Sequence, residues 1–293
     1  DTDTAADWAQ DPGDHLHGRK VLYPGWDLDA FFFTQRVTET ATLTVAVAPD
    51  NLFDTLAPLL PALRLVALEL PGHGFSQHRP PGVHYHFVDY IADVVAAADA
   101  LGWERFALLG HSLGAGICSF VAGVVPDRIS RVAMIEGFGP HSMKPEENPK
   151  ATLQSMAQMH EFEARPLPVY ADLREASKLR ATTSGFSMEI ATLLTARDVK
   201  PIDAGVTWRS DPRLLFKSPL YLTEEQVLAY VTPITAPALV ICGEHGYLPR
   251  RAHMAERYAR VPHLEVKTMP GGHHLHLQDP AAMAEVLRAF FGH

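Results

Sequence analysis

One short turn constrains the fold of this chain more than any other segment. Residues 106–109 form a uniformly apolar run that is typical of a strand covered on both faces, and residues 115–123 are rich in small residues and favour a helix. Between them stands the sequence Gly110-His-Ser-Leu-Gly114. Such a turn strains the backbone at its serine, and glycines on both sides leave the space that side chains would fill. The segment therefore predicts an α/β layer structure in which Ser112 projects above the end of a sheet.

The same alternation of apolar runs and helical patterns recurs along much of the chain. In the stretch 88–101, apolar residues recur at helical spacing, while Asp89, Asp93 and Asp99 fall outside that pattern. Strands and helices in alternation predict a mostly parallel sheet with helices on both faces. The expected strands are residues 42–48, 63–69, 106–109, 132–135, 238–242 and 264–268, and the last expected helix is 281–291.

The alternation stops in the middle of the chain and resumes near residue 237. The intervening segment is rich in Met, Pro, Thr and Arg, with helical patterns around 151–163 and 167–179. A disordered linker is disfavoured because the segment holds many apolar residues. The predicted units are an atypical N-terminal segment (1–40), an α/β core (41–138 and 232–293) and an inserted helical cap (139–231).

Composition and charge exclude several classes of protein. The chain has 293 residues, of which 47% are hydrophobic, and it can bury a sizeable core. A net charge of -9, with 25 Lys and Arg residues in no basic block, argues against nucleic acid as a partner. No apolar run approaches the roughly 20 residues of a membrane span, and the first residues lack the pattern of a signal peptide, so we expect a cytoplasmic location. Cys118 and Cys242 lie in apolar runs, which predicts two buried reduced thiols rather than a disulfide.

A serine hydroxyl is a weak nucleophile until a neighbouring base takes its proton. The segment between the expected strand 264–268 and the final helix holds His273, His274 and His276. His273 follows a pair of glycines on the loop, so we predict it as the base and the other two as structural residues. A metal site on these histidines is the alternative, and it is disfavoured because no cysteine or carboxylate stands at the usual ligand spacing. We therefore expect no metal and no cofactor.

The third group should be a carboxylate that orients the imidazole of the base. Two strand ends offer one. Glu136 directly follows the strand expected over 132–135, and Glu244 lies in the loop Gly243-Glu-His-Gly-Tyr-Leu-Pro249 that follows the strand expected over 238–242. Their positions alone leave both carboxylates open as the acid.

Three motifs resemble the α/β-hydrolase superfamily: Leu70-Pro-Gly-His-Gly-Phe-Ser76, Gly110-His-Ser-Leu-Gly114, and Gly272-His273 with Pro280 seven residues on. More narrowly, the chain resembles the serine hydrolase-like proteins from about residue 48 to the C-terminus. The resemblance implies an α/β-hydrolase fold with an inserted cap and Ser112 as nucleophile. The segments that carry the narrower likeness are 71–74, 78–86, 101–106, 135–140, 208–213 and 222–226.

The resemblance also decides between the two carboxylates. Most of the superfamily places its acid at the position that Gly246 occupies here, and Glu244 stands too early in that loop. Glu136 matches a variant arrangement, found in some haloalkane dehalogenases, in which the acid follows the preceding strand. Those enzymes have an aspartate nucleophile where this chain has Ser112, so we do not expect dehalogenation or epoxide opening. The implied triad is Ser112, His273 and Glu136.

The helix that begins after Ser112 directs backbone N–H groups toward a developing oxyanion. We predict the amide of Leu113 as one donor of an oxyanion hole. The family usually has His-Gly after its third strand, where a second amide completes the hole, and here Pro49 stands at that place without an N–H. The amide of Asp50 is the predicted second donor. Losing one donor typically costs about 10²–10³ in rate.

These residues predict a serine hydrolase that cleaves a carboxylic ester, thioester or lactone of a small apolar molecule through an acyl-enzyme. Perhydrolysis or carbon–carbon cleavage would use the same triad. The alternative is an α/β-hydrolase-fold binding or scaffold protein with weak or no catalysis, which the missing His-Gly favours. We expect a monomer or a homodimer.

Side chains of the predicted cap could line an apolar pocket or could form the core of the cap. We interpret Arg165, Arg180 and Arg209 as solvated surface charge, with recognition of an acidic substrate as the alternative. The apolar candidates of the cap are Met143, Met156, Met159, Phe162, Tyr170, Phe186 and Met188.

Overall fold

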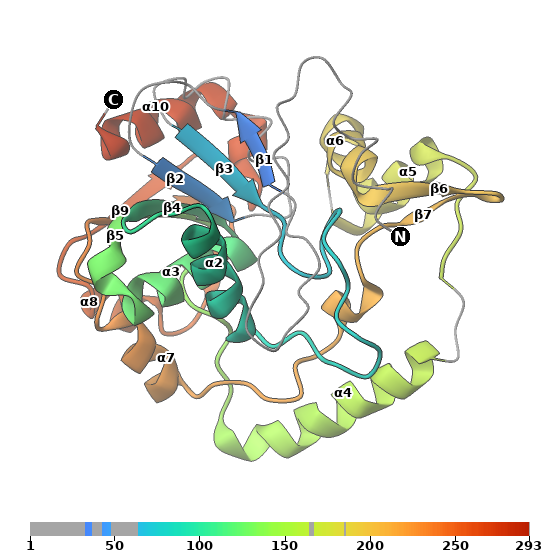
Figure 1. Cartoon of the computed structure of the whole chain (residues 1–293), viewed down its shortest axis with the longest axis horizontal. Coiled ribbons are helices and arrows are strands. Elements are labelled where there is room, and N and C mark those ends of the chain that lie inside the picture. The colour runs from blue at the N-terminus through green and yellow to red at the C-terminus, as the bar shows by residue number, and fades with distance from the viewer. Residues whose placement is uncertain (1–32, 37–42, 48–63, 164–166, 185, 293) are drawn as a thin grey trace.

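A seven-stranded sheet forms the centre of the molecule (Figure 1), and all neighbouring strands in it are parallel except β1, which runs antiparallel to β3. The computed structural model describes residues 33–36, 43–47, 64–163, 167–184 and 186–292. The strand order is β1-β3-β2-β4-β5-β8-β9. The prediction of a mostly parallel sheet is therefore confirmed. The strands are β1 (Phe33–Arg36), β2 (Leu43–Val47), β3 (Arg64–Leu68), β4 (Phe106–His111), β5 (Ile129–Ile135), β8 (Ala238–Gly243) and β9 (Leu264–Met269).

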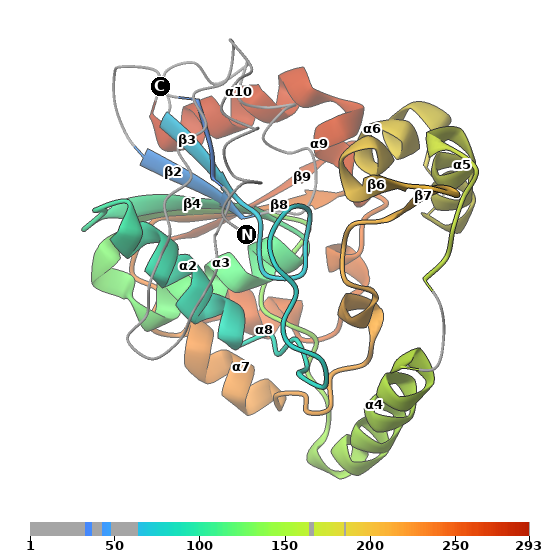
Figure 2. The same cartoon turned by 45° about the vertical axis from the view of Figure 1, so that its right-hand side comes forward.

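Helices cover both faces of this sheet. Buried residues of α2, α3, α7 and α8 share one hydrophobic cluster with one side of the strands, and α9 and α10 share a second cluster with the other side. Figure 2 shows α10 on one side of the sheet and α2 and α3 on the opposite side. The bounds are α2 (Asp89–Ala100), α3 (Leu113–Val124), α7 (Glu224–Val231), α8 (Met254–Ala259), α9 (Leu275–Gln278) and α10 (Pro280–Phe291), with short 3-10 turns η3 (Pro126–Arg128) and η6 (Leu248–Arg250).

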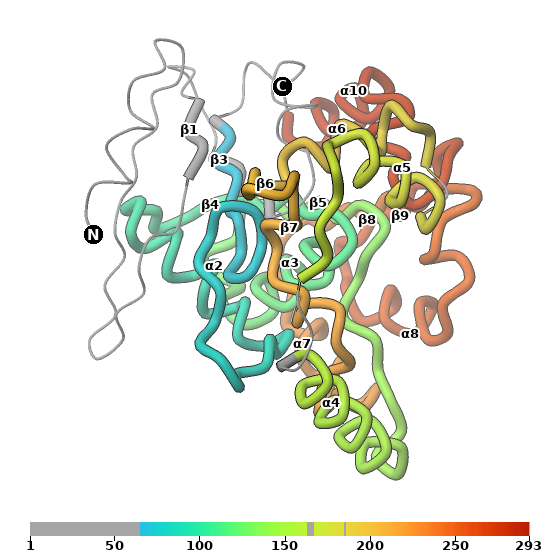
Figure 3. The backbone as a smooth tube through the Cα atoms, turned by 90° about the vertical axis from the view of Figure 1, so that its right-hand side faces the viewer, coloured from blue at the N-terminus to red at the C-terminus, as the bar shows by residue number. Residues whose placement is uncertain are grey.

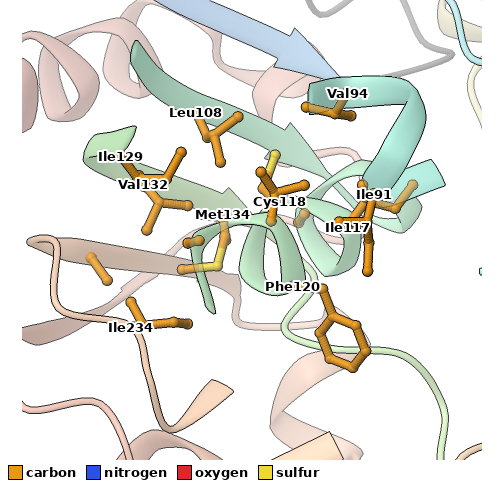
Figure 4. Packing of buried hydrophobic residues seen from close by; sticks show 14 of the residues in the cluster. Ile91, Val94, Leu108, Ile117, Cys118, Phe120, Ile129, Val132, Met134 and Ile234 are labelled. Atoms are coloured by element: carbon orange, nitrogen blue, oxygen red, sulfur yellow. The ribbon is translucent and has the colours of Figure 1, made fainter. Parts of the chain in front are cut away.

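The central strands contribute alternate residues to the two clusters. Leu108 of β4 and Val132 of β5 share one cluster with Cys118 and Phe120 of α3 (Figure 4). Leu109 of β4 belongs to the other cluster, which contains residues of α10. All of these side chains are at most 1% exposed, which is why the strands appear in the sequence as continuous apolar runs. Both cysteines of the chain are buried and free, as expected.

The segment between β5 and β8 lies along one side of the molecule (Figure 3). It contains a long helix at one end and, at the other, two helices with a two-stranded hairpin that the sequence patterns did not predict. Residues 167–172 are not helical, contrary to the expected pattern over 167–179, because Tyr170 forms a β-bridge with Val206 of the hairpin. The elements are η4 (Pro145–Glu147), α4 (Asn148–Glu163), α5 (Leu173–Ser184), α6 (Met188–Asp198), β6 (Val199–Ile202), β7 (Gly205–Trp208) and η5 (Pro212–Leu215).

The last helix of this segment, α7, packs against α3. Val227 and Val231 of α7 are 0% exposed and belong to the same cluster as the core strands. The division of the chain into a core, a cap over 139–231 and an N-terminal segment over 1–40 stays a prediction, and most of residues 1–40 lie outside the described part of the chain.

A buried arginine ties the inserted segment to the loop after β3. The guanidinium of Arg213 pairs with Asp211 and donates hydrogen bonds to the carbonyl oxygens of Pro80 and Val83 at 2.7 and 3.0 Å. The hydroxyl of Tyr85 donates to Asp211 at 2.8 Å. These bonds fix the chain immediately before residues 86–88, which line the site described below.

Within the part of the chain that the structure describes, none of the helices is both long enough and apolar enough to cross a lipid bilayer.

Candidate active site

Ser112 lies in a sharp turn between β4 and α3. Its backbone has φ 52° and ψ −114°, a conformation that side chains rarely adopt, and its N–H donates to the carbonyl oxygen of Ile135 on β5 at 2.9 Å. The turn requires Gly110, because a Cβ there would overlap the backbone of Gly114 on the first turn of α3. The serine therefore projects from the carboxyl end of the central strand, as the sequence predicted.

His273 reaches this serine from the loop between β9 and α9. Its Nε2 lies 2.8 Å from the Oγ of Ser112. Gly243 lets this loop approach the end of β8, since a Cβ on Gly243 would stand only 2.7 Å from the carbonyl oxygens of Gly271 and Gly272. Close packing of the two loops thus sets the position of the imidazole.

Glu136 follows β5 directly and lies on the far side of the imidazole from Ser112. One of its carboxylate oxygens, Oε2, is 3.3 Å from Nδ1 of His273. With Nδ1 donating to this carboxylate, Nε2 is free to accept the serine proton. Glu136 also has a positive φ of 51°, so two neighbouring strands end in the same strained way and bring Ser112 and Glu136 to one edge of the sheet.

Backbone amides of the loop after β8 hold the buried carboxylate of Glu136, which is 3% exposed. Gly243 N–H donates to Oε1 at 2.7 Å and Tyr247 N–H donates to Oε2 at 2.6 Å. Burial by itself raises the pKa of the Glu136 carboxyl, but the hydrogen bonds from His273 and the two amides outweigh burial and hold its pKa below the ordinary range. The group is therefore ionised beside the imidazole at neutral pH.

The other carboxylate considered from the sequence does not reach the site. Glu244 is exposed, and the structure gives it no hydrogen bond to His273. Gly246 lies directly against the carboxylate of Glu136. The loop that usually supplies the acid in this fold thus supplies two amide donors here.

A cavity of about 700 Å³ opens next to Ser112 and His273. This volume suits a small organic ligand. The seven apolar side chains proposed from the inserted segment are absent from its lining, and two of them, Met156 and Met188, are 60% and 44% exposed. The lining residues are His86, Phe87, Val88, Ser112, Leu113, Gly116, Glu136, Gly139, Pro140, His141, Ser218, Leu220, Tyr221, Leu222, Tyr247, Arg250, Arg251 and His273.

The sequence analysis missed the aromatic and cationic part of this lining. Tyr247, Arg250 and Arg251 lie in or directly after the loop that follows β8. Their position after a parallel strand was the available signal, because the loops at the carboxyl ends of neighbouring strands meet at one edge of a sheet.

Leu113 is the first residue of α3 and lines the cavity, so its backbone N–H has no acceptor within the helix. Its role as an oxyanion donor stays a prediction. Asp50, predicted as the second oxyanion donor, lies outside the described residues.

A group of histidines surrounds the base. Nitrogen atoms of His111, His273 and His274 lie within 4.8 Å of one another, a spacing that could hold a metal ion. His111 is fully buried, and its Nε2 lies 2.7 Å from the carbonyl oxygen of His273. A metal on His273 would break its hydrogen bond to Ser112 or to Glu136, so metal binding and the present geometry exclude each other. The ring of His276 packs on His111 at 4.3 Å and lies outside this nitrogen cluster.

The arrangement of sheet, strained serine turn and histidine loop is that of the alpha/beta hydrolase fold. The chain belongs to this family, whose model matches residues 48–280. The resemblance noted from the sequence motifs is thereby confirmed.

Within this family, the chain is similar to proteins that are named serine hydrolases or serine hydrolase-like proteins. A serine hydrolase-like protein of Danio rerio is 30% identical over 258 residues, which cover 81% of this chain and 76% of the relative. A probable serine hydrolase of Drosophila melanogaster is 31% identical over 248 residues, covering 79% of this chain and 74% of the relative.

Solved structures with a similar fold agree with the assignment of the chain to this family. A hypothetical protein from Pseudomonas aeruginosa PAO1 is similar with a TM-score of 0.84 and 36% identity, covering 94% of this chain and 99% of the other. A thioesterase domain from the curacin biosynthetic pathway has a TM-score of 0.78 over 92% of this chain and 98% of its own, but at 22% identity this likeness concerns the fold alone.

Proposed function

We propose that this protein is a serine hydrolase that cleaves a carboxylic ester, or a related thioester or lactone, with Ser112 as nucleophile, His273 as general base and Glu136 as the acid that orients the base. The observation that supports it most is the continuous hydrogen-bonded path from Ser112 Oγ to His273 at 2.8 Å and from His273 to Glu136 at 3.3 Å. This path ends at a cavity that can admit a small molecule.

In the acylation step, Oγ of Ser112 attacks the carbonyl carbon while Nε2 of His273 takes the hydroxyl proton. The carbonyl oxygen becomes an oxyanion, which the N–H of Leu113 at the start of α3 stabilises. The imidazolium carries its positive charge beside the ionised carboxylate of Glu136. Collapse of the intermediate breaks the ester bond, and the imidazolium returns the proton to the leaving alcohol.

Deacylation repeats these steps with water. The imidazole of His273 takes a proton from a water molecule, the resulting hydroxide attacks the acyl carbon, and the proton is returned to Oγ of Ser112 as the acid leaves. The second oxyanion donor is the amide of Asp50 in this proposal. All groups that the reaction uses belong to the chain, so the proposal requires no cofactor.

The test is covalent labelling. A fluorophosphonate probe should phosphonylate Ser112, and mass spectrometry of the digested protein should find the adduct on the peptide that contains it. Ser112→Ala should abolish labelling and turnover of 4-nitrophenyl acetate. The matched control is Ser218→Ala, which removes another hydroxyl from the lining of the same cavity and should leave both unchanged.

Two results would overturn the proposal. One is labelling and turnover that persist in Ser112→Ala. The other is the absence of labelling and of turnover across a panel of short esters, which would favour the binding or scaffold protein. A small-molecule substrate follows from the hydrolase fold, while a monomer or homodimer and a cytoplasmic location stay predictions.

A further inference from the structure

The cavity beside Ser112 has an excess of positively charged groups. The guanidinium-bearing residues Arg250 and Arg251 both line it. Among the described residues, its lining contains one carboxylate, that of Glu136, and both oxygens of this group already accept hydrogen bonds from backbone amides. The whole chain carries a net charge of -9, so the positive charge is a local property of the cavity.

Arg251 is half-buried, and its surroundings differ from those of the two buried arginines Arg213 and Arg257. Within the described residues, its guanidinium has no carboxylate within 4.0 Å and no hydrogen bond, whereas Arg213 pairs with Asp211 at 2.6 Å and Arg257 pairs with Glu224 at 2.7 Å. A cation that is partly removed from water and has no anionic partner is less well stabilised than one in full contact with water. An anion that enters the cavity would supply this partner.

Glu224, whose negative charge acts on the Arg251 guanidinium, is already occupied by other partners. Both carboxylate oxygens of Glu224 accept from Arg257, at 2.7 Å each, and Oε2 also accepts from the hydroxyl of Ser142. Burial, together with the charge of Arg257, lowers the pKa of the Arg251 guanidinium, and the same two arginines lower the pKa of His141 after burial. The guanidinium of Arg251 therefore has positively charged neighbours, and we call the part of the cavity around Arg250 and Arg251 its charged corner.

The position of this corner is fixed relative to the nucleophile. Arg250 ends the short turn η6 and Arg251 follows it, four residues after Tyr247, whose amide holds Glu136. The N–H of Arg251 donates to the carbonyl oxygen of Leu248 at 3.1 Å, which stabilises the turn. One loop thus holds the carboxylate of Glu136 and contributes Arg250 and Arg251 to the lining of the same cavity.

Apart from Ser218, the side chains in the rest of the lining beyond the proposed triad, the arginines and the histidines are apolar or aromatic. Phe87, Val88, Leu220 and Leu222 surround the space beside the charged corner. A ligand that fits must therefore combine a short hydrocarbon part with one anionic group. Guanidinium groups bind the planar carboxylate through paired N–H donors, which favours a carboxylate as this group.

We propose that the substrate is an ester that carries a free carboxylate, such as the monoester of a short dicarboxylic acid, and that Arg251, assisted by Arg250, binds this carboxylate while Ser112 attacks the ester carbonyl. This inference rests on the proposed hydrolase function and narrows its substrate class. Two of the arginines considered from the sequence have other partners, since Arg180 pairs with Asp198 and Arg209 donates to the carbonyl oxygen of Val199. The third, Arg165, lies outside the described residues.

The test compares two esters that differ in one charge: mono-4-nitrophenyl glutarate and its methyl ester, which is neutral. The wild-type protein should hydrolyse the acid with the higher kcat/KM. Arg251→Gln should lower kcat/KM for the acid by about 10- to 100-fold, the effect of losing a charged hydrogen bond, and leave the neutral ester unchanged. Arg251→Lys should recover part of the loss. Arg260→Gln removes an exposed arginine outside the cavity and is the matched control.

A second measurement separates this inference from the hydrolase proposal. Calorimetric titration of Ser112→Ala with glutarate should show binding that Arg251→Gln weakens, whether or not the protein hydrolyses any ester. Equal kcat/KM for the two esters in the wild type, unaffected by Arg251→Gln, would overturn the carboxylate subsite while the hydrolase function stands. Tighter binding of inorganic phosphate than of glutarate would overturn the choice of carboxylate.

Discussion

The carboxylate of Glu136 occupies the space in which a side chain at Gly246 would begin. A Cβ at Gly246 would overlap both oxygens of the Glu136 carboxyl group. Gly246 stands where most alpha/beta hydrolases have their acid, so the two positions compete for one volume beside His273. An acid after β5 therefore requires a residue without a side chain in the loop after β8.

The first prediction moves the acid between these positions. Glu136→Ala should lower kcat by about 10³- to 10⁴-fold, because the imidazole loses the group that orients it. Adding Gly246→Asp to this variant should restore activity by about 10-fold or more, because the new carboxylate enters the vacated space. Ester hydrolysis under saturating substrate measures both effects.

Gly246→Asp alone is the control for this exchange. With Glu136 present, the two carboxylates would overlap, so this variant should lose both activity and thermal stability. A double variant that is no more active than Glu136→Ala would contradict the exchange, provided that circular dichroism shows it to be folded.

The sequence singled out Ser112 and His273, the proposed nucleophile and base, because their signals are local. Ser112 stands between a strand and a helix that can each be recognised from a few neighbours, and His273 follows a glycine pair on the last loop. The choice of Glu136 needed the family resemblance, since its partner His273 is 137 residues away and nothing local links them.

Other features depend on packing that a local pattern does not contain. Asp93 was placed outside the apolar pattern of its helix, yet it is 7% exposed while Ala92 is exposed. The helix is rich in alanine, which can lie on the buried or the exposed face. The pairing of Asp93 with Arg79 at 3.4 Å therefore decides how the helix is rotated about its own axis. Arg251 was likewise overlooked, because the cavity that it lines is formed by loops distant in sequence.

The second prediction concerns metal removal. Both ring nitrogens of His273 have partners in Ser112 and Glu136, so the proposed reaction uses no ion. Dialysis against EDTA should therefore leave ester hydrolysis and the melting temperature unchanged. A mock-dialysed sample is the control. Activity that is lost on dialysis and restored by zinc would instead support a metal bound by the cluster of His111, His273 and His274.

The third prediction concerns the contact between α3 and α7. A Cβ at Gly123 would overlap the carbonyl oxygen of Tyr230 on α7, whose ring stacks on Phe120 at 4.3 Å. Gly123→Ala should therefore destabilise the protein by about 1–3 kcal/mol, even though alanine favours a helix. Urea unfolding measures the change. Gly272→Ala is the matched control, because a Cβ there would meet nothing within 4 Å, and equal losses in the two variants would contradict the packing argument.

The fourth prediction concerns the pH dependence of stability at Asp93. Burial raises the pKa of this carboxyl to about 6, while the charge of Arg79 opposes the rise. In the unfolded chain an aspartate has a pKa of about 3.9, so between these values the folded state holds a proton that the unfolded state has released. The contribution of Asp93 to stability is fully present below about pH 4 and is lost as the pH rises through 6.

Asp93→Asn removes this titration and keeps the shape of the side chain. The stability of the variant relative to the wild type should therefore rise by about 1 kcal/mol between pH 5 and pH 8, measured as the difference in free energy of unfolding in urea. Asp99→Asn is the matched control, because it removes a carboxylate of the same helix that is 59% exposed and is not among the charges that act on Asp93. If the difference between Asp93→Asn and the wild type were the same at both pH values, the buried carboxyl would not be the group that titrates.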